Sequence, residues 1–198
     1  ELTLAEIKVL RLRRGLGGPS ATLTEEQVPT LEEALKASRG VMLLNLDVQA
    51  GVYADVVATV LEAGDTNRVV VKDRASAGSP IMATVAPFDR VPFMPVLASA
   101  TDGRDLPAIA DRQASGRAPV AIELPRMDSA YLASVYTIAR KRRTRLWVNS
   151  LWEGFVRGFG GDAEALKNPD KVWGRLRRSG ASIIQTDEPD ALLLYLRR

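Results

Sequence analysis

Several short apolar runs in this 198-residue chain end in polar residues whose side chains can do chemistry. Those positions are Asp47 and Gln49, Lys72 and Asp73, Glu123, Asn149, Gln185, Thr186 and Asp187. Carboxylate oxygens bind Mg²⁺ and Ca²⁺, and a lysine ammonium can meet a phosphate as a point charge. One polar residue after a strand is usually a loop cap, but several strands that end in this way indicate a functional face.

The residue types that the chain lacks limit this chemistry. It contains neither histidine nor cysteine. This excludes an imidazole base, a Ser-His-Asp triad, a thiol nucleophile, disulfides and zinc–thiolate sites. Any catalysis must therefore use carboxylates, Lys, Arg, Tyr, Ser or Thr, or a metal held by oxygens.

Elements that could position these residues alternate along the chain as short apolar strands and amphipathic helices. We predict strands over residues 41–48, 68–72, 93–98, 120–124, 145–149 and 182–185. We predict helices over residues 52–63, 105–114, 128–141, 170–178 and 190–197, and a short one that opens at Ser79-Pro80. Another helix begins at Thr30, where Glu33 completes a capping box, and ends at Gly40.

Repeated strand–helix units predict a parallel sheet, either open and doubly wound or closed as a barrel. No glycine fingerprint follows a strand, which argues against a dinucleotide-binding fold. A complete (β/α)8 barrel has eight units in about 250 residues. Six units in 198 residues predict an α/β chain that forms one domain, residues 1–198, an incomplete TIM-type barrel short of about two strands.

Motifs at both ends of the chain resemble the glycerophosphodiester phosphodiesterase family. The matching segments are 1–12, 28–35, 44–48 and 180–192, and the last contains the turn Ile184-Gln185-Thr186-Asp187. The segment Leu146-Trp147-Val148-Asn149 resembles the penultimate strand of the family. The resemblance covers nearly the whole chain and is weakest over residues 73–119.

The resemblance implies a TIM barrel that hydrolyses phosphodiesters of glycerol or lipid origin with a divalent metal, Mg or Ca. The acid–base pair of the family is two histidines, which lie in early motifs absent from this chain. We therefore assign no catalytic residue here and expect no activity from this chain alone, although the complete protein would be a phosphoric diester hydrolase. The alternative is a non-catalytic partial barrel that serves as a binding or assembly module.

Four residues are candidate site residues. Asp47 corresponds to a later metal-ligand glutamate of the family, and Glu123 is a second candidate metal ligand; either can instead be a polar strand end or loop cap. Lys72 can face a substrate phosphate or be a solvated loop lysine, and Trp147 can line the substrate cleft or pack in the barrel core. Gln49 stands where the family often has a lysine.

Charge and hydropathy bear on the partners. The net charge is 27 − 24 = +3, which is too weak to predict nucleic-acid binding, and no apolar run is long enough to span a membrane. Glu1 and the lack of an apolar leader suggest a processed or truncated product of unknown compartment. We expect a small phosphodiester ligand. We also expect a homodimer that covers the open edges at 41–48 and 182–185, unless residues 1–18 fold over one edge.

Overall fold

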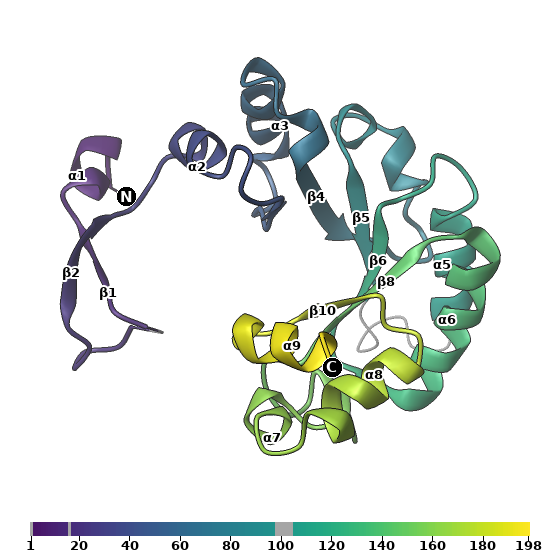
Figure 1. Cartoon of the computed structure of the whole chain (residues 1–198). Helices are drawn as coiled ribbons and strands as arrows, with labels where there is room; N and C mark the ends of the chain where they lie inside the picture. The colour runs from purple at the N-terminus through teal and green to yellow at the C-terminus, as the bar shows by residue number, and fades with distance from the viewer. Residues whose placement is uncertain (1, 16, 98–104) are drawn as a thin grey trace.

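The computed structural model describes residues 2–15, 17–97 and 105–198. Its centre is a parallel sheet whose strands are β3 (Leu44–Leu46), β4 (Val69–Arg74), β5 (Phe93–Val96), β6 (Ala121–Leu124), β8 (Arg145–Asn149) and β10 (Ile183–Gln185). Each strand after β3 pairs with the sheet strand that precedes it in the chain. Because the order never reverses, the sheet is not doubly wound. It curls like part of a barrel (Figure 1).

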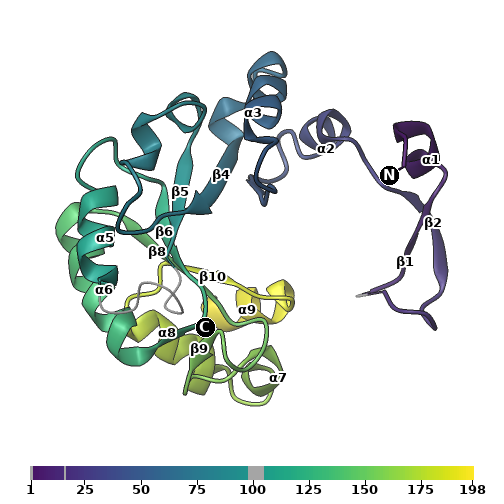
Figure 2. The ribbon, with the colours of Figure 1, turned by 180° about the vertical axis from the view of Figure 1, so that it is seen from behind.

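Helices cover the outer, convex side of this sheet, as both ribbon views show for α3, α5, α6 and α8 (Figures 1 and 2). The α-helices are α1 (Leu4–Lys8), α2 (Leu31–Ala37), α3 (Tyr53–Glu62), α5 (Leu106–Gln113), α6 (Ser129–Arg142), α7 (Asp162–Ala165), α8 (Arg175–Arg178) and α9 (Pro189–Leu196). A π-helical turn, Asp170–Gly174, leads into α8, and 3-10 turns span Thr66–Arg68, Met82–Thr84 and Phe88–Arg90. Two small sheets pair β1 (Arg11–Arg13) with β2 (Leu23–Gln27) and β7 (Met127–Asp128) with β9 (Val156–Arg157).

Local capping explains where two of the helices begin. At α2 the backbone N–H of Glu33 donates to Oγ1 of Thr30, and the Glu33 carboxylate accepts from the Thr30 N–H, as the sequence predicts. At α6 the carboxylate of Asp128 accepts from the N–H groups of Ala130 and Tyr131, both at 3.0 Å. Free N–H groups at a helix start need such acceptors, so these residues define the two helix starts.

The hydrophobic core lies between the convex face of the sheet and its helices. One cluster packs Ile122, Leu124, Leu146 and Val148 of β6 and β8 against α5, α6 and the segment around Trp173. A second, smaller cluster packs β4 against α2, α3 and the Phe88 turn. The convex face is therefore the buried one, and the concave face is left for other contacts.

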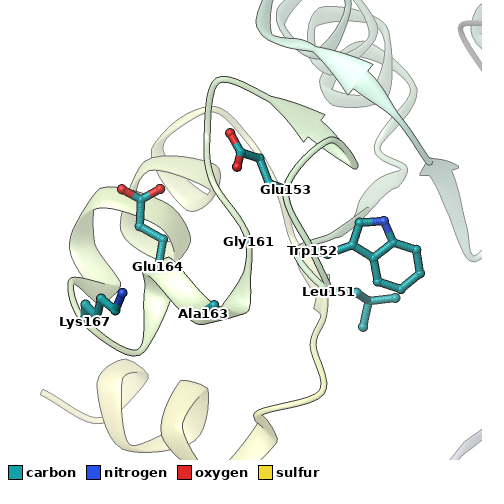
Figure 3. Close-up of a pocket in the computed structure, with 7 residues that line it drawn as sticks. All are labelled: Leu151, Trp152, Glu153, Gly161, Ala163, Glu164 and Lys167. Carbon is teal, nitrogen blue, oxygen red and sulfur yellow. The ribbon is translucent and has the colours of Figure 1, made fainter. Parts of the chain in front are cut away.

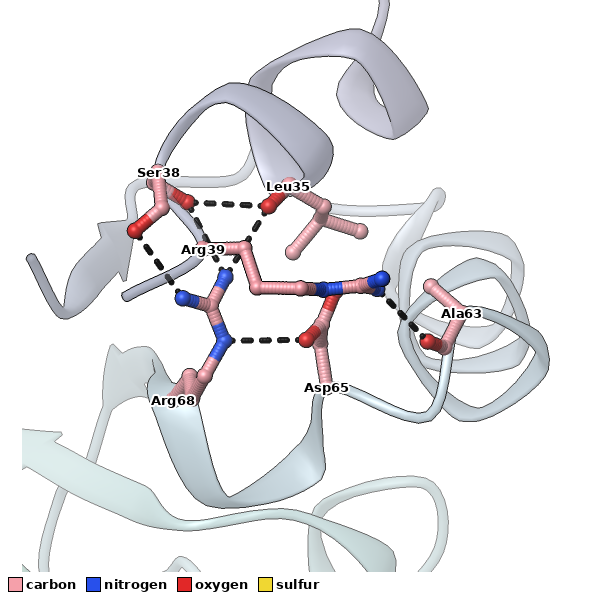
Figure 4. A network of polar contacts seen from close by, with 6 residues as sticks. All are labelled: Leu35, Ser38, Arg39, Ala63, Asp65 and Arg68. Carbon is pink, nitrogen blue, oxygen red and sulfur yellow. Dashed lines mark hydrogen bonds and ion pairs between the residues drawn. The ribbon is translucent and has the colours of Figure 1, made fainter. Parts of the chain in front are cut away.

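A polar network around Arg68 closes the amino end of β4 against α2 (Figure 4). The Arg68 guanidinium donates to the carbonyl oxygens of Leu35 and Ser38, each at 2.9 Å, and so satisfies free carbonyls at the end of α2. Asp65 joins Arg68 and Arg39 through ion pairs of 2.9 Å each. These two guanidinium groups, with Arg39 the larger influence, hold the pKa of the Asp65 carboxyl below its ordinary value.

The expectations for the first strand and for residues 1–18 need correction. The first strand spans only Leu44–Leu46 rather than 41–48, because it pairs on one side alone and follows a turn at Gly40, whose φ is +77°. For residues 11–27, where the sequence predicts no element, the structure has the antiparallel hairpin β1–β2, whose mostly exposed strands give no apolar pattern to detect. The hairpin stands apart from the main sheet and covers neither of its edges (Figures 1 and 2).

Two further expectations concern the end of the third predicted strand and membrane-spanning segments. The expected end of a strand at residue 98 lies outside the described residues. Within the described ranges, no helix combines the length and the apolar character that crossing a bilayer requires.

Candidate functional site

Lys72 is the centre of a polar cluster on the concave face of the sheet. Its ammonium nitrogen lies 3.0 Å from Oε2 of Glu123 and 3.3 Å from Oδ2 of Asp47. Lys72 retains only 8% of its surface and Glu123 only 3%. Burying a charge is costly unless an opposite charge compensates it, and the two buried groups compensate each other.

Strand alternation accounts for this inward placement. Val71 packs into the convex-side core, and so do Ile122 and Leu124. Because successive side chains of a strand point to opposite faces, Lys72 and Glu123 face the concave side. β5 lies between their strands. The contact therefore requires two long side chains, such as lysine and glutamate.

The cluster continues across the remaining strands as a chain of hydrogen bonds. Nδ2 of Asn149 donates to Oε1 of Glu123 at 3.1 Å. Nε1 of Trp147 donates to Oδ1 of Asn149 at 3.0 Å and to Oε1 of Gln185 at 3.3 Å. Polar contacts thus run from the loop after β3 to β10, near the carboxyl ends of the strands.

The two ion pairs of Lys72 differ in strength. The side chain of Glu123 is 4% exposed, whereas that of Asp47 is 80% exposed. Water and salt screen the Asp47 pair, which makes it the weaker one. Beside this cluster, the hydroxyl of Tyr53 donates to the carbonyl oxygen of Lys72 at 3.0 Å. Burial, followed by the charge of Asp73, raises the pKa of Tyr53 to about 12.

The arrangement does not fit a divalent metal. Mg²⁺ and Ca²⁺ need six or more oxygen ligands. Asp47 and Glu123 both face the ammonium of Lys72, and Asn149 occupies the second oxygen of Glu123. In the described part of the chain, no three acidic side chains are grouped so that they could hold a metal ion.

All four candidate residues from the sequence thus belong to one contiguous cluster. Asp47, Lys72 and Glu123 meet directly, and Trp147 joins them through Asn149. Asn149 and Gln185 had been noted only as polar strand ends. Their positions at the ends of apolar runs are the one sequence signal for their hydrogen bonds within the cluster.

Two hollows of the surface can be compared with this cluster. A pocket of about 340 Å³ lies between the loop after β8 and α7 (Figure 3). In that view Glu164 and Lys167 lie on one side of Gly161 and the indole of Trp152 on the other. A second cavity, of about 380 Å³, adjoins the cluster at Trp147 and is lined mainly by apolar side chains, among them Leu44, Val70 and Ile183.

Comparisons with known proteins place the fold. The family model DUF4996, described as a domain of unknown function, matches residues 93–196. No curated protein matches the chain.

Two solved structures share its architecture. One is a protein of Galdieria sulphuraria described as a glycerophosphodiester phosphodiesterase, with a TM-score of 0.61 and 15% identity over 100% of this chain and 71% of that chain. The other is the glycerophosphodiester phosphodiesterase of Agrobacterium tumefaciens, with a TM-score of 0.59 and 16% identity over 97% of this chain and 71% of that chain. The resemblance predicted from the sequence is thus confirmed at the level of the fold.

Proposed function

Because the chain belongs to the DUF4996 family and shares its fold with two glycerophosphodiester phosphodiesterases, we propose that it is the six-stranded part of a barrel that binds phosphodiesters of glycerol or lipid origin. The observation that supports this most is the Lys72 cluster. It lies at the carboxyl ends of the strands, on the concave face, which is where TIM-type barrels carry their active sites.

Two residues of this face would contact the ligand. One hydrogen of the Lys72 ammonium is donated to Glu123, and Asp47 forms only an ion pair with it, so the ammonium keeps donor capacity for a phosphate oxygen. The partly buried indole of Trp147 offers an apolar surface next to it for the glycerol or head group. This chain therefore binds and orients the phosphodiester.

Hydrolysis is a separate step that this chain does not perform alone. Cleavage of a phosphodiester needs a group that activates water and an acid that protonates the leaving oxygen. The chain has no histidine, and Glu123, the buried carboxylate of the cluster, is already paired with Lys72. In the proposed enzyme, the acid–base groups belong to a part of the barrel that this chain does not contain.

A second candidate function is a binding or assembly module without catalysis. The Lys72 ammonium between two carboxylates favours it, because a paired site of this kind has lost the open oxygens that a metal-dependent hydrolase needs. The two candidates differ in their ligand: the phosphodiesterase must bind a phosphodiester at the cluster, and an assembly module need not.

Titration with glycerophosphocholine tests the proposal. The chain has three tryptophans, so fluorescence reports binding only with controls. We expect saturable quenching in the wild type and in Trp152→Phe, and loss of the quenching in Trp147→Phe. Absence of saturable quenching in the wild type rejects phosphodiester binding and leaves the assembly module.

A parallel hydrolysis assay tests the inactivity of the chain. With added Mg²⁺ or Ca²⁺, we expect product formation at the level of a buffer blank. Turnover above that blank, abolished by Asp47→Ala, would show that this chain carries its own catalytic groups.

A further inference from the structure

We propose that the ammonium of Lys72 is a built-in cation that takes the place of a divalent metal between Asp47 and Glu123. This inference deepens the proposed function, because it concerns the same site, but it rests on contacts within the chain and not on any ligand. It predicts that the site binds its phosphodiester ligand without added metal.

The contacts of Glu123 support this assignment. Both of its carboxylate oxygens are occupied: Oε2 by Lys72 at 3.0 Å and Oε1 by Asn149 at 3.1 Å. Each oxygen keeps a second lone pair, but Glu123 is only 3% exposed, so a metal ion could reach this carboxylate only if one of these partners moved aside. Each oxygen of the carboxylate thus accepts from a nitrogen donor of the chain.

Backbone contacts on both sides fix the position of Lys72. The hydroxyl of Tyr53 holds the Lys72 carbonyl at 3.0 Å, and the residue pairs in register with Met94 of β5. The side chain extends across β5 to Glu123, with Asp47 on its exposed side. A strand position, rather than a mobile loop, thus places the ammonium between the two carboxylates.

Charge balance then excludes a second cation. The three groups together carry one negative charge, which is less than a divalent ion requires for tight binding. An ion that bound the same carboxylates would lie within a few ångströms of the ammonium, and like charges at that separation repel strongly in a poorly solvated site. Removal of the lysine charge should reverse this balance and create a cation site.

The substitution Lys72→Met tests the inference, because methionine keeps an unbranched side chain and removes the charge. Terbium(III) serves as the probe, with emission excited through Trp147, which one side chain links to Glu123. We expect no saturable emission from the wild type and saturable emission from Lys72→Met. The double variants Lys72→Met/Asp47→Asn and Lys72→Met/Trp147→Phe should lose it.

Calcium calorimetry gives the affinity. We expect Lys72→Met to bind Ca²⁺ at least tenfold more tightly than the wild type. Equal affinities overturn the inference. If Lys72→Met does not fold, Lys72→Gln replaces it in both measurements.

A wild-type arm decides the question without any lysine variant. Saturable Ca²⁺ binding to the wild type that Asp47→Asn abolishes overturns the inference, and identical titrations of the two proteins support it. The outcome is separable from that of the proposed function, because glycerophosphocholine quenching is measured in the presence of a chelator. Failure of that quenching rejects phosphodiester binding and leaves the cation results as they are.

Discussion

The phenol oxygen of Tyr53 lies 3.0 Å from the carbonyl oxygen of Lys72 and donates a hydrogen bond to it. The same hydroxyl lies 3.2 Å from the carbonyl oxygen of Val48. Tyr53 is the first residue of α3, so one side chain ties that helix to β4 and to the loop after β3. Only the protonated phenol can donate to these carbonyl oxygens. The contacts that join α3 to β4 and to the loop after β3 therefore depend on pH.

We expect the phenol of Tyr53 to ionise near pH 12, against about pH 10 for an ordinary tyrosine. Because burial raises the folded-state pKa, the contribution of Tyr53 to stability is full below about pH 10 and is lost as the pH rises toward 12. An ultraviolet titration of the four tyrosines should show this late step, and Tyr53→Phe should remove it. Tyr136→Phe is the matched control, and its loss of the same step would contradict the assignment.

Asp65 should make the stability of the chain sensitive to acid. Its pKa is lowered in the folded state by Arg39 and Arg68, so its contribution is full above the ordinary aspartate pKa of about 3.9 and is lost as the pH falls below that value. Asp65→Asn should therefore be less stable than the wild type at neutral pH, and the gap should shrink in acid. Urea unfolding at several pH values measures the gap; a gap that stays constant argues against the ion pairs.

Ser150 should be a strong stability determinant although it is small. Its hydroxyl donates to the buried carboxylate of Asp162 at 2.6 Å and accepts from Nε1 of the buried Trp173 at 3.1 Å. Ser150→Ala leaves that indole N–H without its acceptor, which costs about 1–3 kcal/mol of unfolding free energy.

A control serine is available for the Ser150 measurement. Among the described residues, the hydroxyl of Ser134 hydrogen-bonds only to the carbonyl of Tyr131, within its own helix. Ser134→Ala should therefore change the free energy of unfolding by no more than about 0.5 kcal/mol. Denaturant midpoints with unchanged slopes compare the two variants, and equal effects would contradict the buried network.

The open edges of the sheet lead us to expect a dimer. β3 and β10 end the main sheet, and no described strand pairs with their outer sides. Beside β3, the side chains of Val41 and Leu43 are 72% and 76% exposed. Even a few hundred Å² of such surface represents several kcal/mol at about 25 cal/mol per Å².

Sedimentation equilibrium at micromolar concentration measures this association. We expect a mass above the 21.5 kDa of one chain for the wild type, and a monomer for Leu43→Glu. Leu166→Glu is the control, because it places the same charge on an exposed leucine beyond α7. A monomeric wild type that binds no hydrophobic dye contradicts the dimer.

Local signals in the chain were enough to predict much of the architecture. The capping box of Thr30 and Glu33, the long helix after Asp128 and the strand Arg145–Asn149 follow from near-neighbour hydrogen bonds and apolar periodicity. The positions of the two open edges followed from the order of the strands, and the sheet confirms both. Where such signals are absent, as in the exposed hairpin of residues 11–27, the sequence predicts no element.

The chemistry of the site depended on contacts that no local pattern encodes. Lys72 and Glu123 are separated by 51 residues and by an intervening strand, and Asn149 joins them from 26 residues further on. The sequence pattern predicts all three at strand ends, and it predicts only Lys72 and Glu123 as potential ligands, of a phosphate and a metal respectively. Only the curl of the sheet and the burial of both charges made the lysine and the glutamate partners, because two opposite charges removed from water are stable only together.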